Sequence, residues 1–158
     1  MSTLINSTEL REISLGRYVQ GQRSTIGAGG GTKQVFTVAG GEVLITALWG
    51  KVATAITLAT ETVALQLDPT TGTTVTWVAA TDLGTTDSAV GDLIGVVDES
   101  TTTPDFRING RPLTNILATT GEIEAVIADV TGTEDGAIDW FCTYVPLTAG
   151  ATVVAATT

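Results

Sequence analysis

The stretch Phe36–Ile56, FTVAGGEVLITALWGKVATAI, decides the fold class of this chain. A short apolar run is followed by the turn Ala39-Gly40-Gly41 and by a long apolar run. Successive side chains of a strand point to opposite faces, so the long run divides into two sets. One face is expected to carry Leu44, Thr46, Leu48, Gly50 and Val52, and the other Val43, Ile45, Ala47, Trp49 and Lys51. Because both sets are largely apolar, we expect this strand to be covered on at least one side, and the pattern favours cover on both.

The same stretch predicts the central hairpin of a β-sandwich or barrel. An amphipathic helix would show a polar stripe every three to four residues, and no such stripe is present. The two glycines permit positive φ where the chain reverses. The chain has 158 residues, with 31 threonines and 18 glycines, which suits one domain rich in strands.

From Lys33 onward, short apolar runs alternate with turn signals. Residues 63–67 alternate regularly, and Asp68–Gly72 has the composition of a turn. In residues 138–144, the side chains of Ile138, Trp140, Cys142 and Tyr144 are expected to share one face. About eight to ten such strands predict a single-domain antiparallel β-sandwich of jelly-roll type, or alternatively a small β-barrel.

The N-terminal region differs from the rest. We expect residues 1–32 to form an extended arm with a Gly-rich linker, and residues 33–158 to form the β-sandwich domain. Within the arm, a short helix is predicted to begin near Ser7 or Thr8 and to end at Gly16, before an extended segment. Such an arm is either disordered or laid on a neighbour. Its candidate contact residues are Leu10, Ile13, Leu15, Arg17 and Tyr18.

Charge is distributed unevenly along the chain. The formal net charge is −10, but residues 1–33 carry four basic and two acidic side chains. The acidic body would be repelled by nucleic acid and by anionic membranes, so we expect neither as a partner. No apolar run approaches the roughly 18 residues of a membrane span, and the N-terminus lacks the pattern of a secretory signal.

The residues that would carry catalysis are missing or isolated. The chain contains no histidine, which removes the commonest general base and the commonest zinc ligand. Cys142 lies in an aromatic strand and is expected to be buried and structural. Asp98-Glu99 and Glu134-Asp135 are expected to be solvated pairs, and residues 129–136 to form an acidic turn rather than a calcium site. We therefore expect no enzyme activity, cofactor or metal.

Three tryptophans lie on apolar strand faces. Trp49, Trp77 and Trp140 are therefore expected in the core, with stacking on a sugar as the alternative for any one of them.

Three stretches resemble a family of bacteriophage proteins. They are Phe36–Ile56, LQLDPTTGTTVTW (Leu65–Trp77) and WFCTYVPLTAGATVVAA (Trp140–Ala156). Residues 34–156 resemble the capsid cement or decoration proteins of tailed bacteriophages, while the first 33 residues are not matched. The resemblance implies a non-enzymatic virion protein on the capsid exterior, made in the host cytoplasm. It also implies a homotrimer that binds the major capsid protein and stabilises the head against DNA pressure.

Two other functions stay open at this stage. One is another phage structural role, such as a tail-tube subunit or a head-fibre base. The other is a carbohydrate-binding jelly-roll module, which would need an exposed Trp or Tyr.

Overall fold

One short helix and twelve strands make up the part of the chain that the computed structural model describes, namely residues 6–26, 30–57, 61–84, 88–97, 103–128 and 136–157. In chain order the elements are α1 (Ser7–Leu15), β1 (Arg17–Gln20), β2 (Ser24–Ile26), β3 (Gly31–Ala39), β4 (Val43–Thr54), β5 (Thr62–Pro69), β6 (Val75–Asp82), β7 (Leu93–Val96), β8 (Phe106–Ile108), β9 (Ile116–Ala118), β10 (Gly121–Ala128), β11 (Gly136–Pro146) and β12 (Thr152–Ala155). Within those ranges, no helix has the length and apolar character that crossing a membrane requires.

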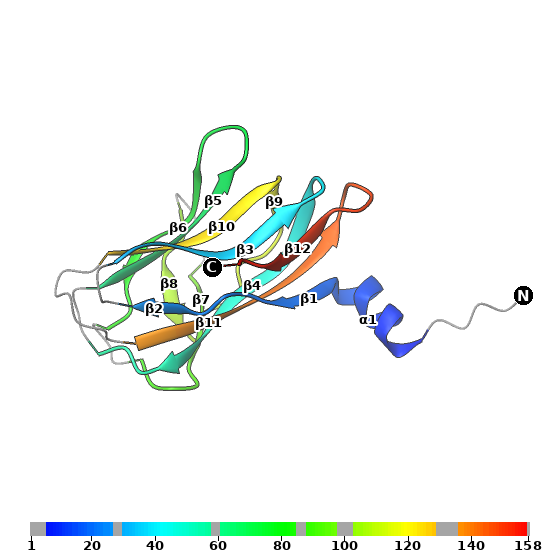
Figure 1. Ribbon diagram of the computed structural model, residues 1–158. Coiled ribbons are helices and arrows are strands. Elements are labelled where there is room, and N and C mark those ends of the chain that lie inside the picture. Colours follow the sequence, from blue (N-terminus) through cyan, green and yellow to red (C-terminus); the bar gives the residue numbers. More distant parts are fainter. Residues whose placement is uncertain are drawn as a thin grey trace, which may run out of the picture.

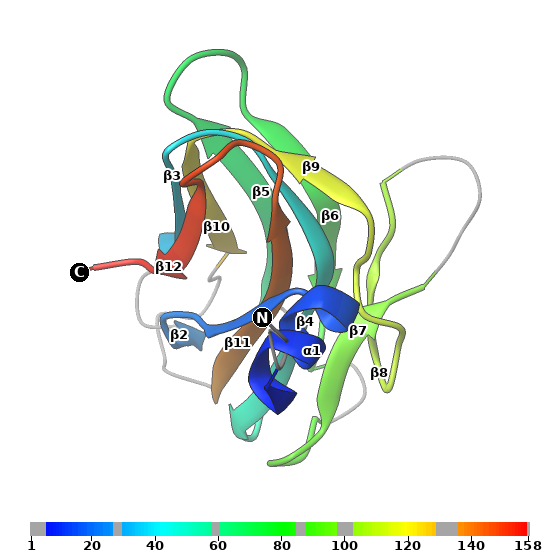
Figure 2. The ribbon, with the colours of Figure 1, turned by 90° about the vertical axis from the view of Figure 1, so that its right-hand side faces the viewer.

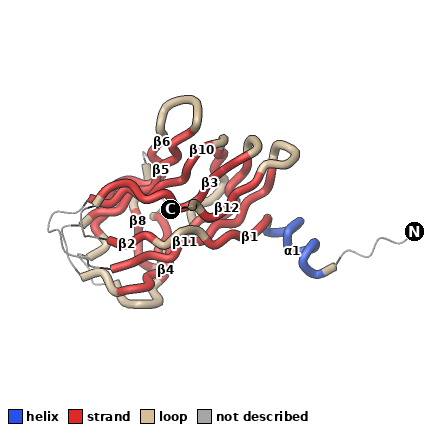
Figure 3. The backbone as a smooth tube through the Cα atoms, in the orientation of Figure 1, coloured by secondary structure: helices blue, strands red, loops and turns tan. Residues whose placement is uncertain are grey.

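The strands form two antiparallel sheets that face each other (Figures 1 and 3). The seven-stranded sheet has the order β1-β11-β4-β7-β8, with β2 paired to β11 and β9 paired to β4. The five-stranded sheet has the order β12-β3-β10-β5-β6. This arrangement confirms the predicted all-β sandwich.

The turn Ala39-Gly40-Gly41 connects the two sheets, so the predicted hairpin is wrong. β3 pairs with β10 and β12, whereas β4 pairs with β11, β7 and β9. The two glycines do adopt positive φ, 76° and 131°, as the turn requires. A Gly-Gly turn suits any sharp reversal, and here both flanking strands find their partners elsewhere in the chain.

A second connection, between β11 and β12, crosses between the sheets beside the first. The backbone N–H of Leu147 donates to the carbonyl oxygen of Glu42 at 2.9 Å. In return, the backbone N–H of Glu42 donates to the hydroxyl of Thr148 at 3.1 Å. The two crossings therefore support each other at one end of the sandwich.

A β-bulge in β4 overturns the expected division of its side chains. Opposite β11, Ala47 pairs with Thr143 and Ile45 pairs with Tyr144, so Thr46 is an extra residue on β4. A bulge of this kind shifts the alternation by one position. The residues of β4 that are buried against the core are Val43, Ile45, Leu48, Gly50 and Val52. Trp49 and Lys51 consequently point away from the core.

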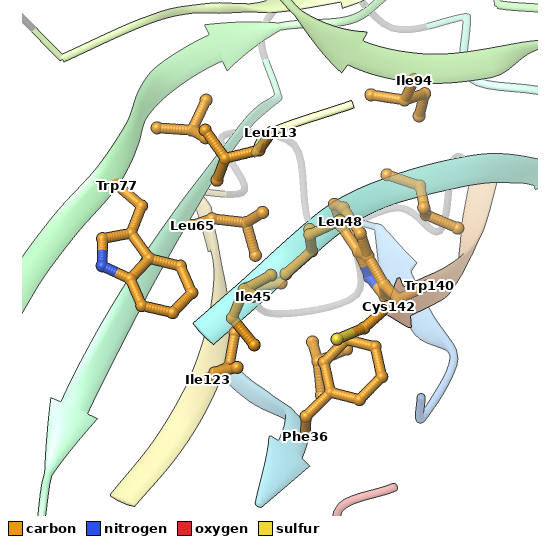
Figure 4. Close-up of a cluster of buried hydrophobic side chains, with 14 of the residues drawn as sticks. Phe36, Ile45, Leu48, Leu65, Trp77, Ile94, Leu113, Ile123, Trp140 and Cys142 are labelled. Carbon is orange, nitrogen blue, oxygen red and sulfur yellow. The ribbon is translucent and has the colours of Figure 1, made fainter. Parts of the chain in front are cut away.

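The core lies between the two sheets (Figure 4). Trp140 is its largest fully buried side chain, and its indole N–H donates to the hydroxyl of Ser24 at 3.0 Å. The four residues of β11 expected on one face are all buried, as are Val63, Leu65 and Leu67 of β5. Each large apolar side chain buried in this way contributes roughly 1.5–3 kcal/mol.

Part of the predicted arm lies in the sandwich of its own chain. β1 pairs with the second half of β11, and β2 pairs with its first half, so both extend the seven-stranded sheet. Ile26, expected in the flexible linker, is fully buried in β2, and Thr32 lies in β3. Residues 1–5 and 27–29 lie outside the described ranges. For residues 17–26, the neighbouring surface is therefore β11 of the same chain.

Candidate functional site

Helix α1 begins and ends where the sequence predicts. The side chain of Asn6 accepts hydrogen bonds from the backbone N–H groups of Thr8 and Glu9, at 3.0 and 2.9 Å. The Glu9 carboxylate accepts the backbone N–H of Asn6 at 2.9 Å, which completes a capping box. At the other end, Gly16 adopts a φ of 86° and its N–H donates to the carbonyl oxygen of Glu12. The predicted short helix is confirmed.

No residue of α1 is buried, and the helix projects beyond the end of the strands (Figures 1 and 2). Its apolar side chains are the most exposed group in the N-terminal region, with exposed fractions of 58% for Leu10, 71% for Ile13 and 61% for Leu15. Exposing apolar side chains to water is energetically unfavourable. An isolated helix shorter than about 12–15 residues is also only marginally stable. The apolar residues of α1 are therefore available to a partner.

The base of the helix is fixed to the sandwich. The hydroxyl of Thr46, the bulge residue of β4, donates to the carbonyl oxygen of Leu15 at 3.0 Å. A Cβ at Gly16 would lie 2.6 Å from the carbonyl oxygen of Tyr144, so only glycine fits this approach. The direction in which α1 leaves the body is therefore set by contacts with β4 and β11.

Between α1 and the end of β11 lies an open cleft of about 420 Å³. Its lining comprises Glu9, Glu12, Ile13, Arg17, Tyr144, Val145 and Pro146. The guanidinium of Arg17 lies 3.9 Å from the Glu12 carboxylate, which is a weak ion pair between exposed groups. The structure thus brings Ile13 and Arg17 together, while Leu10 and Leu15 do not line this cleft.

A cluster of three aromatic rings lies on the outer face of the seven-stranded sheet. Trp49 of β4 pairs directly with Phe141 of β11, and their ring centroids are 5.6 Å apart with planes 21° apart. Tyr18 of β1 lies 6.3 Å from Phe141 and 6.5 Å from Trp49. We call these three residues the aromatic strip.

The aromatic strip contains every aromatic residue of the chain that is not buried. The chain has eight aromatic residues, and the other five, Phe36, Trp77, Phe106, Trp140 and Tyr144, are buried. The prediction of a core position is thus confirmed for Trp77 and Trp140 and wrong for Trp49. Lys51 could have revealed this, because it shares a face with Trp49 and a lysine belongs on the solvent side of a strand.

Polar and apolar groups border the strip. Arg23 forms a bidentate ion pair with Asp139 of β11, with N–O distances of 2.6 and 3.0 Å. Lys51 of β4 is paired in register with Asp139 on one side and with Leu93 of β7 on the other. Beside Trp49 there is also a small apolar cleft of about 210 Å³, which Leu93, Ile94, Gly110 and Pro112 line with it.

Cys142 is buried, and its thiol is poorly suited to act as a nucleophile. Burial raises the pKa of the Cys142 thiol to about 12, so the thiolate that a nucleophile needs is rare near neutral pH. The described ranges contain no group of three or more potential metal ligands. Asp98-Glu99, Glu134-Asp135 and nearly all of the acidic segment 129–136 lie outside these ranges.

Comparison with known proteins gave no match: no family model fits the chain, and no curated protein or solved structure resembles it significantly.

Proposed function

We propose that this protein is a non-enzymatic virion structural protein, a cement or decoration protein that binds the outer surface of a tailed-phage capsid. In this proposal it forms a homotrimer, bridges neighbouring major capsid proteins and stabilises the head against the pressure of packaged DNA. It is made in the host cytoplasm, and it needs no cofactor, nucleic acid or membrane.

The observation that carries the proposal is helix α1. It is capped at both ends and fixed at its base, yet it exposes Leu10, Ile13 and Leu15 to water. A short exposed helix with apolar residues gains stability when it packs on another surface. A rigid sandwich that presents such a helix suits a clamp between subunits, because several weak contacts then act together.

Binding to capsids that have been stripped of their decoration tests the proposal. The wild-type protein is expected to co-sediment with such capsids and to delay their disruption on heating. A variant with Leu10→Asp and Ile13→Asp is expected to lose this binding while it keeps its circular dichroism spectrum. The matched control is Val90→Asp, since Val90 is also highly exposed (67%) but lies far along the chain from α1.

A truncation can replace the double substitution, but its endpoint matters. Removing residues 2–15 deletes α1 and leaves β1 intact, whereas a deletion through residue 26 would also remove β1 and β2 from the sheet. Unchanged capsid binding by the shorter truncation would show that binding depends on no contact of α1, whether with the capsid or within the homotrimer. Failure of the full-length protein to bind any capsid of its phage would exclude the function itself.

The solution mass separates the proposed function from the other phage role. Light scattering is expected to give a trimer, three times the 16.2 kDa of the chain. A six-fold ring or a tube would instead assign the protein to the tail.

A carbohydrate-binding function is favoured by one observation, the aromatic strip. The exposed ring of Tyr18 and the half-buried rings of Trp49 and Phe141 offer an apolar face. Arg23, Asp139 and Lys51 beside them offer hydrogen-bonding groups. This function predicts that soluble oligosaccharides change the fluorescence of Trp49. The Trp49→Phe variant should abolish that change, because Trp77 and Trp140 are buried.

A further inference from the structure

The aromatic strip has the composition of a protein contact surface. Tyr, Trp and Arg are the residues that most often carry binding energy at interfaces, and the strip and its border contain all three. Leu93, at 48% exposure, extends the apolar surface onto the next strand. The strip and Leu93 therefore form one surface across β1, β11, β4 and β7, which are consecutive neighbours in the sheet.

The dimensions of this surface match those of α1. Four neighbouring strands span three inter-strand spacings, about 14 Å in all. The nine residues of α1, at a rise of 1.5 Å each, give a length of about 13.5 Å. One helix of this length therefore covers the surface from Tyr18, in the strip, to Leu93.

The side chains on the two surfaces are complementary. Leu10 and Ile13 are three residues apart and form one apolar ridge, and Glu9 and Glu12 form an acidic row beside it. On the strip, apolar rings are bordered by the exposed amine of Lys51 and by the Arg23–Asp139 ion pair, in which the arginine is the more exposed partner. An apolar ridge would thus meet apolar rings while its acidic row faces a basic side chain.

The helix of the same molecule does not reach its own strip. Thr46 and Gly16 hold the end of α1 at the last residues of β11, and from there the helix points away from the body (Figure 1). Only a second copy can place α1 over Trp49 and Phe141. A contact between two different surfaces of the same chain is heterologous, and it closes into a ring when the rotation permits.

We propose that α1 of one copy packs across the aromatic strip of a second copy, with Leu10 and Ile13 against Trp49, Phe141 and Leu93. This inference rests on the proposed function, because it assigns the partner of α1 within the homotrimer. Other surfaces then bind the capsid, and the Leu10→Asp and Ile13→Asp variant loses capsid binding because the homotrimer, with its several weak contacts, comes apart.

Disulfide trapping between two differently labelled copies tests this contact. Both copies carry Cys142→Ala; one also carries Ile13→Cys and the other Leu93→Cys. After mixing and mild oxidation, the mixed disulfide is expected to form about 100-fold faster than with a control pair, because contact raises the effective concentration of the two thiols. The control replaces Leu93→Cys by Val154→Cys, which has nearly the same exposure (49%) but lies on β12 of the five-stranded sheet.

Equal trapping rates for the two pairs would overturn the inference, as would an oligomer of unchanged mass in the Leu10→Asp and Ile13→Asp variant. A soluble oligosaccharide that changes Trp49 fluorescence without altering the oligomer would assign the strip to a sugar instead.

The capsid assay separates this inference from the proposed function. Fast trapping without capsid binding would support the helix contact and reject the cement function. Capsid binding with equal trapping rates would support the function and reject this contact.

Discussion

The strands of the two sheets differ in charge, and the outer faces of the sheets differ in the way their side chains are satisfied. Strands of the seven-stranded sheet carry three basic residues, Arg17, Lys51 and Arg107, and one acidic residue, Asp139. Strands of the five-stranded sheet carry one basic residue, Lys33, and four acidic residues, Asp68, Asp82, Glu122 and Glu124. The net charge of −10 is therefore not shared evenly between the strands of the two sheets.

Polar pairs complete the surface of the five-stranded sheet. The hydroxyl of Thr37 donates to Glu122 at 2.8 Å, and the side-chain amide of Gln66 donates to Glu124 at 2.8 Å. Such cross-strand pairs stabilise the sheet and satisfy the carboxylates, of which Glu124 is buried. On the seven-stranded sheet, aromatic rings occupy the corresponding central positions. The two outer faces thus differ in their central side chains, which are polar pairs on one sheet and aromatic rings on the other.

The largest expected effect separates the inner from the outer side of the seven-stranded sheet. Trp140→Ala should lower the free energy of unfolding by about 3–5 kcal/mol, because it leaves a cavity and removes the partner of Ser24. Trp49→Ala should cost less, about 1–2 kcal/mol, because Trp49 is only half-buried and each of its two aromatic contacts is worth roughly 0.5–1.5 kcal/mol. Urea unfolding at low protein concentration measures both. Equal costs would mean that the outer rings serve the fold.

The next prediction compares the two outer faces directly. Leu93→Asp should weaken self-association about 30-fold, since burying a charge in the contact in place of an apolar side chain, even beside Lys51, costs on the order of 2 kcal/mol. Val154→Asp, at matching exposure on the five-stranded sheet, should leave it unchanged. Sedimentation equilibrium gives both constants. A larger effect at Val154 would reverse the assignment of the contact face.

A third prediction concerns the thiol on the inner side of β11. The pKa of Cys142 is about 12 in the folded protein, against an ordinary value of 9.0. The stability that this difference gives is fully present below pH 9 and is lost as pH rises toward 12, by up to about 1.4 kcal/mol per pH unit. Unfolding of the wild type should therefore become easier with pH more steeply than that of Cys142→Ala. Identical slopes would show that the thiol is accessible to water.

The smallest effect is expected at the border of the strip. Arg23→Gln removes the ion pair with Asp139, which also raises the pKa of the arginine through a hydrogen bond. Because Arg23 is exposed, the midpoint of thermal unfolding should fall only slightly, and the difference should vanish in about 1 M salt. A double-mutant cycle with Asp139→Asn measures the coupling. A large coupling that resists salt would contradict the view of this pair as a surface interaction.

Regular alternation made much of the fold predictable. In β5 and β11, every second residue is apolar and is buried, so the pattern alone placed Leu65 and Cys142 correctly. The sequence likewise predicted α1, with a start near Ser7 or Thr8 and an end at Gly16. These features depend on residues that are close together in the sequence, so a local sequence pattern can predict them.

Features that depend on distant strands were not predictable in this way. The bulge at Thr46 exists because β4 must match the register of β11, and nothing within β4 announces it. The Gly40-Gly41 turn has the same composition whether it closes a hairpin or crosses between sheets. Trp49 was wrongly predicted in the core because the bulge was not foreseen. The aromatic strip was missed with it, because Phe141 and Tyr18 reach Trp49 only through pairing between strands.

The crossing between β3 and β4 also bears on when this protein can fold. Val43 on β4 pairs with Pro146, and Thr37 on β3 pairs with Val154, so both early strands have partners near the other end of the chain. During synthesis, these strands leave the ribosome before any partner exists. Folding with such non-local pairing is slow, and unpaired apolar strands aggregate. The rate at which the ribosome delivers β10 to β12 therefore sets how long β3 stays unpaired, whereas β4 can pair earlier with β7 and β9.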